Sequence, residues 1–261
     1  MSLASLPTLT RSTCTAYYTS GSAMRSRSVS DRVLTGRVEV PAPPPGLLAD
    51  WRRDIELRLG LEPGDVECLS LPRARRRWPD YPLCLQAVAD WTRSLGLQEV
   101  LANSDVALMA CRGAKYHHDG AQYGGMAFCN LFLSEDRGLD LHFAVTGKRI
   151  PLTLGTVVVF DTGQPHAVIA RQRSGFNAAD FPPDQDCSQV FLSWELPIEN
   201  APLAQVLHIS FDTDPAAALL LDQEQLLIQG EAAYVCPDSG RWCRVDRPID
   251  EHRLDGGRAK N

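Results

Sequence analysis

The chain has 261 residues, of which 44% are hydrophobic and 22% charged, and its formal net charge is −6. This composition is typical of a globular protein with one large domain, and the negative charge disfavours a nucleic-acid partner because phosphate-binding surfaces are basic. No apolar run approaches the roughly 18 residues that a membrane-spanning helix needs, so we expect no membrane partner.

Residues 1–30 are rich in Ser, Thr and Arg and contain no acidic residue. They lack the continuous apolar segment of a secretory signal, and the eight cysteines of the chain are too sparse for a disulfide framework. We therefore predict a cytoplasmic protein with reduced thiols and a flexible or edge segment at residues 1–30, while a targeting role of that segment stays open. Cys236 and Cys243 lack the CxxC spacing of a structural zinc site, and we interpret them as structural.

Residues 31–100 are predicted to form a helical buttress for the rest of the protein. Residues 47–61 follow the proline-rich segment PAPPPG, and their apolar side chains recur at helical spacing. Residues 83–97 form a second amphipathic pattern. The basic segment between these two helices, residues 71–82, is predicted to be a loop.

From about residue 103 the sequence changes to short β-branched and aromatic runs separated by Gly, Asp, Pro and Asn. Such runs are typical of an antiparallel sandwich or barrel, so we predict a mainly β core at residues 101–198. The predicted strands are VALMAC (106–111), MAFCNLFLS (126–134), LDLHFAV (139–145), RIPLTL (149–154), TVVVFD (156–161), HAVIAR (166–171) and QVFLSWEL (189–196).

Residues 199–261 are predicted to be a C-terminal extension of this core. VLHISFD (206–212) has the pattern of a strand, and DPAAALLLDQEQLLIQ (214–229) has the pattern of a helix. The polar residues 249–261 are expected to be mobile.

The segment KYHHDG contains candidate metal ligands. His117 and Asp119 are two residues apart, a spacing that places both side chains on one face of a strand. His166 follows an apolar strand and a glycine-containing turn, and it is the candidate third ligand. Two histidines and one carboxylate form the facial triad of non-haem Fe(II) oxygenases, which leaves coordination positions open. A simple turn at Asp119-Gly120 is the alternative interpretation.

Residues 113–194 resemble the 2-oxoglutarate/Fe(II)-dependent dioxygenase superfamily, in particular its prolyl-hydroxylase-like branch. The resemblance implies a double-stranded β-helix (jelly-roll) core with flanking N-terminal helices. It also implies an oxidoreductase, a hydroxylase that uses Fe(II), 2-oxoglutarate and O2 at His117, Asp119 and His166. The matching segments are GAKY (113–116), HHD (117–119), GLDLHF (138–143), PLTLGTVVVF (151–160), HAV (166–168) and QVFLSWEL (189–196).

The chain departs from this family at the basic residue that holds the far carboxylate of 2-oxoglutarate. The positions where the family places it carry Phe176, Asn177, Ser188 and Gln189 here. A guanidinium binds a carboxylate through two parallel hydrogen bonds, so Arg171 and Arg173 are the predicted anchors. Tyr116 and Asn130 are further predicted contacts of 2-oxoglutarate, and the alternative anchors are Arg112, Lys148 and Arg149.

Two other functions stay open at this point. A cupin-like metalloprotein that does not use 2-oxoglutarate would share the barrel, but cupins usually carry HxH and a Glu in their first motif. A non-catalytic protein on the same scaffold would explain the missing basic residue. A halogenase is disfavoured because Asp119 occupies the position that halide would need. For an oxygenase we expect a small molecule or a protein side chain as substrate, with residues 171–188 as a lid.

Overall fold

The described chain has more residues in antiparallel β-strands than in helices, which confirms the prediction of a mainly β protein. The computed structural model describes residues 14–58, 63–102, 104–182 and 184–244. The strands predicted between residues 106 and 196 are confirmed, with small shifts in their bounds. The strands are β1 (Cys14–Ser20), β2 (Ala23–Ser28), β3 (Val33–Arg37), β4 (Val66–Leu69), β5 (Val106–Cys111), β6 (Ala114–His117), β7 (Met126–Phe132), β8 (Leu139–Phe143), β9 (Lys148–Pro151), β10 (Thr156–Asp161), β11 (His166–Ala170), β12 (Gln189–Pro197), β13 (Gln225–Ile228), β14 (Glu231–Val235) and β15 (Trp242–Arg244).

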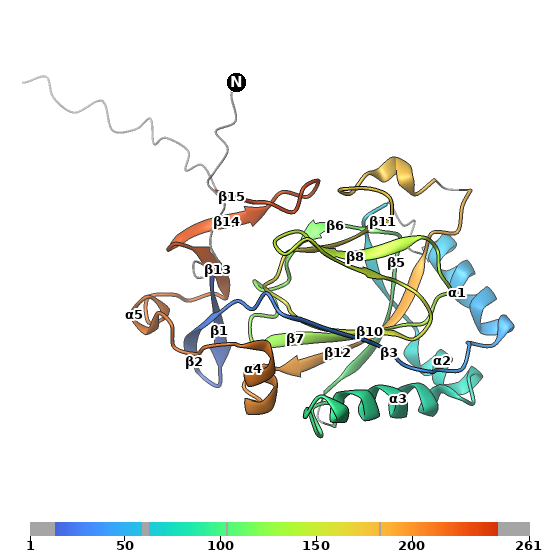
Figure 1. The fold of residues 1–261 in the computed structure, drawn as a ribbon, viewed down its shortest axis with the longest axis horizontal. Helices are drawn as coiled ribbons and strands as arrows, with labels where there is room; N and C mark the ends of the chain where they lie inside the picture. Colours follow the sequence, from blue (N-terminus) through green and yellow to red (C-terminus); the bar gives the residue numbers. More distant parts are fainter. Residues whose placement is uncertain (1–13, 59–62, 103, 183, 245–261) are drawn as a thin grey trace, which may run out of the picture.

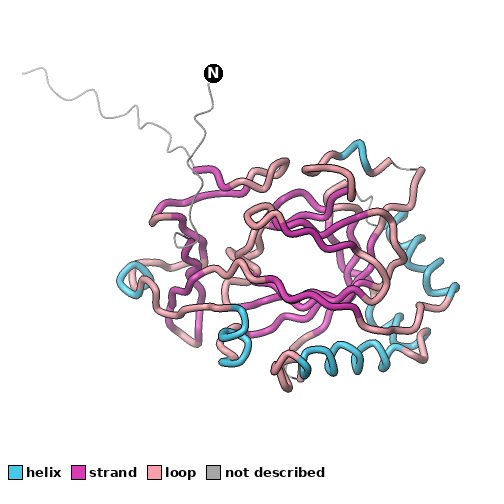
Figure 2. The backbone as a smooth tube through the Cα atoms, in the orientation of Figure 1, coloured by secondary structure: helices cyan, strands magenta, loops and turns pink. Residues whose placement is uncertain are grey.

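Two of the three sheets face each other at the centre of the molecule. A six-stranded sheet has the order β3-β10-β7-β12-β5-β4, and a four-stranded sheet has the order β6-β11-β8-β9. Figure 1 shows the four-stranded sheet above the six-stranded one, and the tube in Figure 2 follows the same two layers. The third sheet, β15-β14-β13-β1-β2, lies to one side of this pair.

Side chains along each strand of the six-stranded sheet point alternately to its two faces, and a separate hydrophobic cluster lies on each face. On β12, Leu192 and Trp194 point outward, whereas Phe191 belongs to the cluster between the two sheets. Helices α1 (Pro45–Arg58), α2 (Leu71–Arg77) and α3 (Tyr81–Ser94) cover the outward face. Burial of one sheet face under helices leaves the opposite face free to line an interior space.

The helices α1 and α3 confirm the two amphipathic patterns, but the segment between them was predicted wrongly. Residues 71–77 form α2 and not a loop, because Pro72 occupies its first turn and Ala74 is buried against the core. The six-stranded sheet also takes both of its edge strands, β3 and β4, from residues 31–100.

Two predictions in the C-terminal extension were also wrong. The segment predicted as a strand begins inside helix α4 (Ala201–Leu207), which ends at His208 in the left-handed conformation. The predicted helix is limited to α5 (Pro215–Ala218), and Gln225–Ile228 form β13, which pairs with β1. Long-range pairing with the N-terminal strand overrides the local helical pattern. The predicted mobile segment 249–261 lies outside the described residues.

The N-terminal segment forms a β-hairpin over its described part. Strands β1 and β2 pair with each other, and β1 also pairs with β13. Residues 1–13 lie outside the described part of the chain. The eight cysteines are free thiols, and no helix within the described ranges is long and apolar enough to cross a membrane.

Gly155 fixes the approach of β3 to the turn before β10. Its φ of +83° is left-handed, and a Cβ atom there would lie 2.1 Å from the carbonyl oxygen of Val38. We expect Gly155→Ala to lower the free energy of unfolding by more than the ~1–2 kcal/mol that a left-handed backbone costs an ordinary residue. Urea unfolding measures this loss.

Gly147→Ala is the matched control. Gly147 also has a left-handed φ, of +69°, but nothing lies within 4 Å of the position that a Cβ atom would take there. Its substitution should therefore cost only the backbone term, and equal losses for the two variants would contradict the close approach at Val38.

Candidate metal centre

Three residues with metal-binding side chains meet where the two facing sheets come together. His117 ends β6 and His166 begins β11, and the antiparallel register pairs them directly. Asp119 follows β6, and its backbone N–H donates to the carbonyl of Thr162 at 2.8 Å. The two chain segments that carry the ligands are therefore joined by strand pairing and by a backbone hydrogen bond next to the site.

The ligand atoms converge on one point. The donor atoms of His117, Asp119 and His166 all lie within 4.8 Å of one another. Nε2 of His117 lies 3.8 Å from Oδ1 of Asp119, and Nε2 of His166 lies 3.6 Å from Oδ2 of the same carboxylate. This separation leaves room for one ion among the three groups, and the donor set of two imidazoles and one carboxylate suits non-haem Fe(II).

Backbone carbonyls fix the orientation of both imidazoles. Nδ1 of His117 donates to the carbonyl of Lys115 at 2.7 Å, and Nδ1 of His166 donates to the carbonyl of Gln164 at 2.9 Å. When Nδ1 carries the proton, the lone pair of Nε2 is free to coordinate a metal. Both rings thus present their Nε2 atoms toward Asp119.

Burial shifts the protonation of the ligands in opposite directions. It is the main cause that lowers the pKa of His166 to about 3, and the nearby His117 contributes to the same effect. Burial also raises the pKa of Asp119, against the opposing effect of His117 and His118. A divalent cation would remove the cost of the buried carboxylate charge while finding His166 already neutral.

The three ligands lie on the wall of a cavity between the two sheets. The cavity has a volume of about 370 Å³, which is within the size range of small-molecule sites. Aromatic and aliphatic side chains from both sheets form most of its wall, among them Phe128, Phe132, Leu141, Phe160 and Phe191. These side chains make the wall next to the metal ligands largely apolar.

A buried ion pair braces both segments that carry the ligands. Arg27 on β2 forms hydrogen bonds with Asp161 at 2.7 and 2.9 Å, and both side chains are fully buried. Asp161 also accepts from the N–H of Gly163, within the turn that leads to His166. Nε of Arg27 donates to the carbonyl of Gly124, in the loop that follows Asp119. One side chain from outside the facing sheets therefore holds both loops.

Only one predicted 2-oxoglutarate contact lines the cavity, and it is Asn130. Arg171 pairs with Asp136 and Asp140, and Arg173 pairs with Asp180. Neither arginine lines the cavity, because Asp140 points to the opposite side of β8 from the lining residue Leu141. The structure therefore does not bring these two predicted anchors to the metal ligands.

Tyr116 is also turned away from the cavity. Its hydroxyl is hydrogen-bonded to Nδ1 of His142, and its ring packs against Gly240 of the turn before β15. The register shift between β6 and β11 near His166 changes the side-chain alternation just before His117. Sequence spacing alone placed Tyr116 beside the ligands and could not show this shift.

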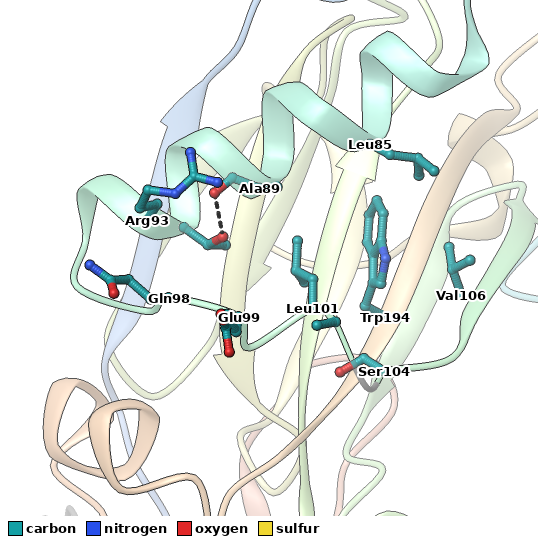
Figure 3. Close-up of a pocket in the computed structure, with 11 residues that line it drawn as sticks. Leu85, Ala89, Arg93, Gln98, Glu99, Leu101, Ser104, Val106 and Trp194 are labelled. Atoms are coloured by element: carbon teal, nitrogen blue, oxygen red, sulfur yellow. Dashed lines mark hydrogen bonds between the residues drawn. The ribbon is translucent and has the colours of Figure 1, made fainter.

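A second pocket lies on the outer face of the six-stranded sheet, between α3 and the ends of β5 and β12. Its volume is about 570 Å³, and Figure 3 shows Leu85 and Ala89 of α3 opposite Trp194 and Val106. Thr92 donates to the carbonyl of Ala89 within the helix. Trp194 is 3% exposed and belongs to the core. No candidate metal ligand lies in this pocket.

Comparison with known proteins found similarity only among solved structures. No protein-family model matches the chain, and no curated protein matches it. A prolyl-4-hydroxylase of Pseudomonas putida shares 17% identity over 63% of this chain and 91% of its own, with a TM-score of 0.39. The viral collagen prolyl hydroxylase of Paramecium Bursaria Chlorella virus-1 shares 10% identity over 65% and 96%, with a TM-score of 0.38.

A third similar structure is the non-haem α-ketoglutarate-dependent epimerase of nogalamycin biosynthesis. It shares 16% identity over 66% of this chain and 83% of its own, with a TM-score of 0.33. These proteins belong to the superfamily that the sequence motifs resemble.

The buried ion pair between Arg27 and Asp161 predicts that substitution of Arg27 lowers both the stability and the metal affinity of the protein. Arg27→Ala would leave the Asp161 carboxylate buried without its partner, which typically costs about 3–5 kcal/mol, and would release the loops that carry the ligands. Urea unfolding and titration with Co(II) measure the two effects.

Arg25→Ala is the control, because Arg25 lies on the same strand but pairs at the surface, and such pairs contribute about 0–1 kcal/mol. Unchanged Co(II) affinity in a folded Arg27→Ala protein would contradict the brace.

The low pKa of His166 predicts how the stability of the metal-free protein depends on pH. Unfolded His166 has the ordinary pKa of 6.5 and binds a proton that folded His166, with a pKa of about 3, does not bind. As the pH rises from about 3 to 6.5, His166 therefore increases the free energy of unfolding of the metal-free protein. His166→Asn should reduce the slope by up to about 1.4 kcal/mol per pH unit, the value for one proton. Urea unfolding with a chelator present tests this, and an identical slope in the variant would refute it.

Proposed function

We propose that this chain is a mononuclear non-haem Fe(II) oxygenase that uses 2-oxoglutarate and O2 to hydroxylate a C–H bond. The observation that carries the proposal is the convergence of His117, Asp119 and His166 on the wall of a cavity between the two sheets. The two facing antiparallel sheets support a double-stranded β-helix, or jelly-roll, core at residues 101–198. The substrate would be a small molecule or a protein side chain.

The residues present fit an iron ion. Two imidazoles with their Nδ1 protons engaged and one carboxylate would hold Fe(II) and leave further positions free for other ligands. When bound, the iron would supply O2 activation. The chain's own contribution would be to orient the three ligands and to surround the reacting atoms with apolar walls.

The fit to 2-oxoglutarate is less complete, because its far carboxylate needs a hydrogen-bond donor. No Lys or Arg lines the cavity within the described part of the chain. The neutral donors that face it include the phenol of Tyr123, Asn130 and, directly opposite Asn130 on β12, Ser193. Gln189 lies further along the same face of β12 and is fully buried, and neither of its amide atoms has a hydrogen-bond partner in the described chain. These neutral groups are the ones that would have to replace a basic anchor.

This absence of a basic lining residue favours one alternative function. A cupin-like metalloprotein would use the same ligands without a dicarboxylate co-substrate, and it would need no cation in the cavity. A non-catalytic protein on the same scaffold would need neither the metal nor the co-substrate. The three functions differ in which ligands the protein binds.

Anaerobic binding of Fe(II) with 2-oxoglutarate separates these functions. We expect the weak visible charge-transfer band of a chelated metal in the wild-type protein and its loss in His117→Ala and in His166→Ala. His118→Ala is the matched control: His118 is the middle residue of the motif, but its ring lies against Trp242 and does not join the ligand cluster. Its band should remain.

Each other result has a distinct meaning. Fe(II) binding without the band would contradict the use of 2-oxoglutarate and support the cupin-like function. An absence of metal binding in the wild-type protein would contradict both metal-dependent functions. The non-catalytic function on the same scaffold would then remain.

A further inference from the structure

Two carboxylates on neighbouring strands line the cavity: Asp105 is exposed, and Glu195 is half-buried. Asp105 immediately precedes β5, Glu195 lies on β12, and the N–H of Glu195 donates to the carbonyl of Asp105 at 3.4 Å. Their neighbours Val106 and Trp194 are paired in the register, so the two acidic residues are adjacent across the strands. Both residues line the cavity that contains the metal ligands.

Nothing within the described chain neutralises these charges. Neither Asp105 nor Glu195 forms an ion pair or a side-chain hydrogen bond with a described residue, and no Lys or Arg contributes to the cavity wall. Like charges opposite each other on adjacent strands destabilise a sheet. Asp105 is exposed and Glu195 half-buried, so the pair gives this side of the cavity a negative potential that would attract a cation.

An independent observation in the same cavity points to a polar ligand. The Asn130 side chain is 7% exposed and lines the wall, and its Oδ1 atom has no hydrogen-bond partner among the described residues. Its register partner is Ser193, which lies on the same face of β12 as Glu195. A buried amide oxygen without a partner costs free energy until a donor reaches it.

Tyr123 links the carboxylates to the metal centre. Its ring packs against Phe128, the register partner of Glu195. Its backbone N–H donates to the carbonyl of Asp119 at 2.8 Å. Glu195 therefore lies on the Tyr123 side of the cavity, toward the metal ligand Asp119.

We propose that the cavity takes a cationic substrate, with an ammonium or guanidinium group held between Asp105 and Glu195. This substrate class deepens the proposed oxygenase function and rests on it. An ammonium offers three hydrogen-bond donors and a guanidinium offers five, with no acceptor in either. The two carboxylates only accept hydrogen bonds, and the Ser193 hydroxyl oxygen and the Asn130 carbonyl oxygen can accept further ones. The positive charge also offsets carboxylates that the protein leaves uncompensated.

The experiment uses the full-length protein loaded with Co(II), whose visible spectrum reports both the metal site and ligands that enter beside it. Two isosteric pairs of probes are titrated: N-acetyl-arginine methylamide against its citrulline counterpart, and N-acetyl-lysine methylamide against its 2-aminoheptanoic acid counterpart. We expect the cationic member of at least one pair to bind at least about tenfold more tightly than its neutral isostere. Equal affinities, tighter binding of the neutral member, or no binding of either cation at millimolar concentration would overturn the proposal.

Variants then locate the effect. Glu195→Gln should remove about tenfold of the preference for the cation and leave the affinity for Co(II) unchanged. Glu67→Gln is the matched control, because Glu67 lies on β4 between two lining residues and does not itself line the cavity. Glu195→Gln relieves a like-charge contact, so its melting temperature should equal or exceed that of the wild-type protein. A preference that survives in the Asp105→Asn, Glu195→Gln double variant would refute these residues as the binding site.

The same experiment distinguishes failure of this inference from failure of the proposed function. Co(II) binding without discrimination between the isosteres would refute the cationic substrate while leaving the metal site. If the wild-type protein does not bind Co(II), the proposed function fails, and calorimetric titration of the metal-free protein with the same probes tests the cation site separately. A preference for the cation there would support the site, and its absence would refute it.

Discussion

The ion pair between Arg27 and Asp161 is the constraint on which the candidate site depends. Two opposite charges lie fully buried, and their hydrogen bonds reach the N–H of Ser30, the N–H of Gly163 and the carbonyl of Gly124. A buried pair of this kind adds little net stability over an apolar replacement, but the loss of one partner is costly. Its effect here is geometrical: a strand of the third sheet fixes the two loops that bring the metal ligands together.

The cavity combines apolar and acidic walls. Apolar side chains from both sheets line it together with the metal ligands and the two further carboxylates of Asp105 and Glu195. With a divalent metal bound, the three carboxylates of the cavity would still exceed the metal charge by one. A dicarboxylate co-substrate would increase this excess, and a cationic substrate would reduce it. Both the missing basic anchor and the unpaired acidic residues therefore contribute to the same quantity, the net negative charge of the cavity.

Local sequence patterns predicted the parts of the fold that local physics determines. The strands between residues 106 and 196 were predicted from alternation and turn residues, and α1 and α3 from helical spacing. The HxD spacing placed His117 and Asp119 on one strand end, and His166 is their neighbour through a register that the residue pattern alone does not state. The segment 214–229 failed because its apolar residues suit a helix, yet Gln225–Ile228 pair with a strand about 200 residues earlier in the chain. Arg27 was missed because no short-range signal marks a basic residue whose partner lies on β10. The predicted anchors Arg171 and Arg173 failed to reach the cavity because their carboxylate partners lie outside it.

X-ray absorption at the iron edge of the anaerobic Fe(II)-loaded protein would test the central claim most directly. A centre held by Nε2 of His117, Nε2 of His166 and one oxygen of Asp119 should show two imidazole ligands together with oxygen ligands. Substitution of His166 should remove one imidazole and leave the other. A spectrum with sulfur ligands, or one that is unchanged by substitution of either histidine, would place the iron elsewhere and contradict the account.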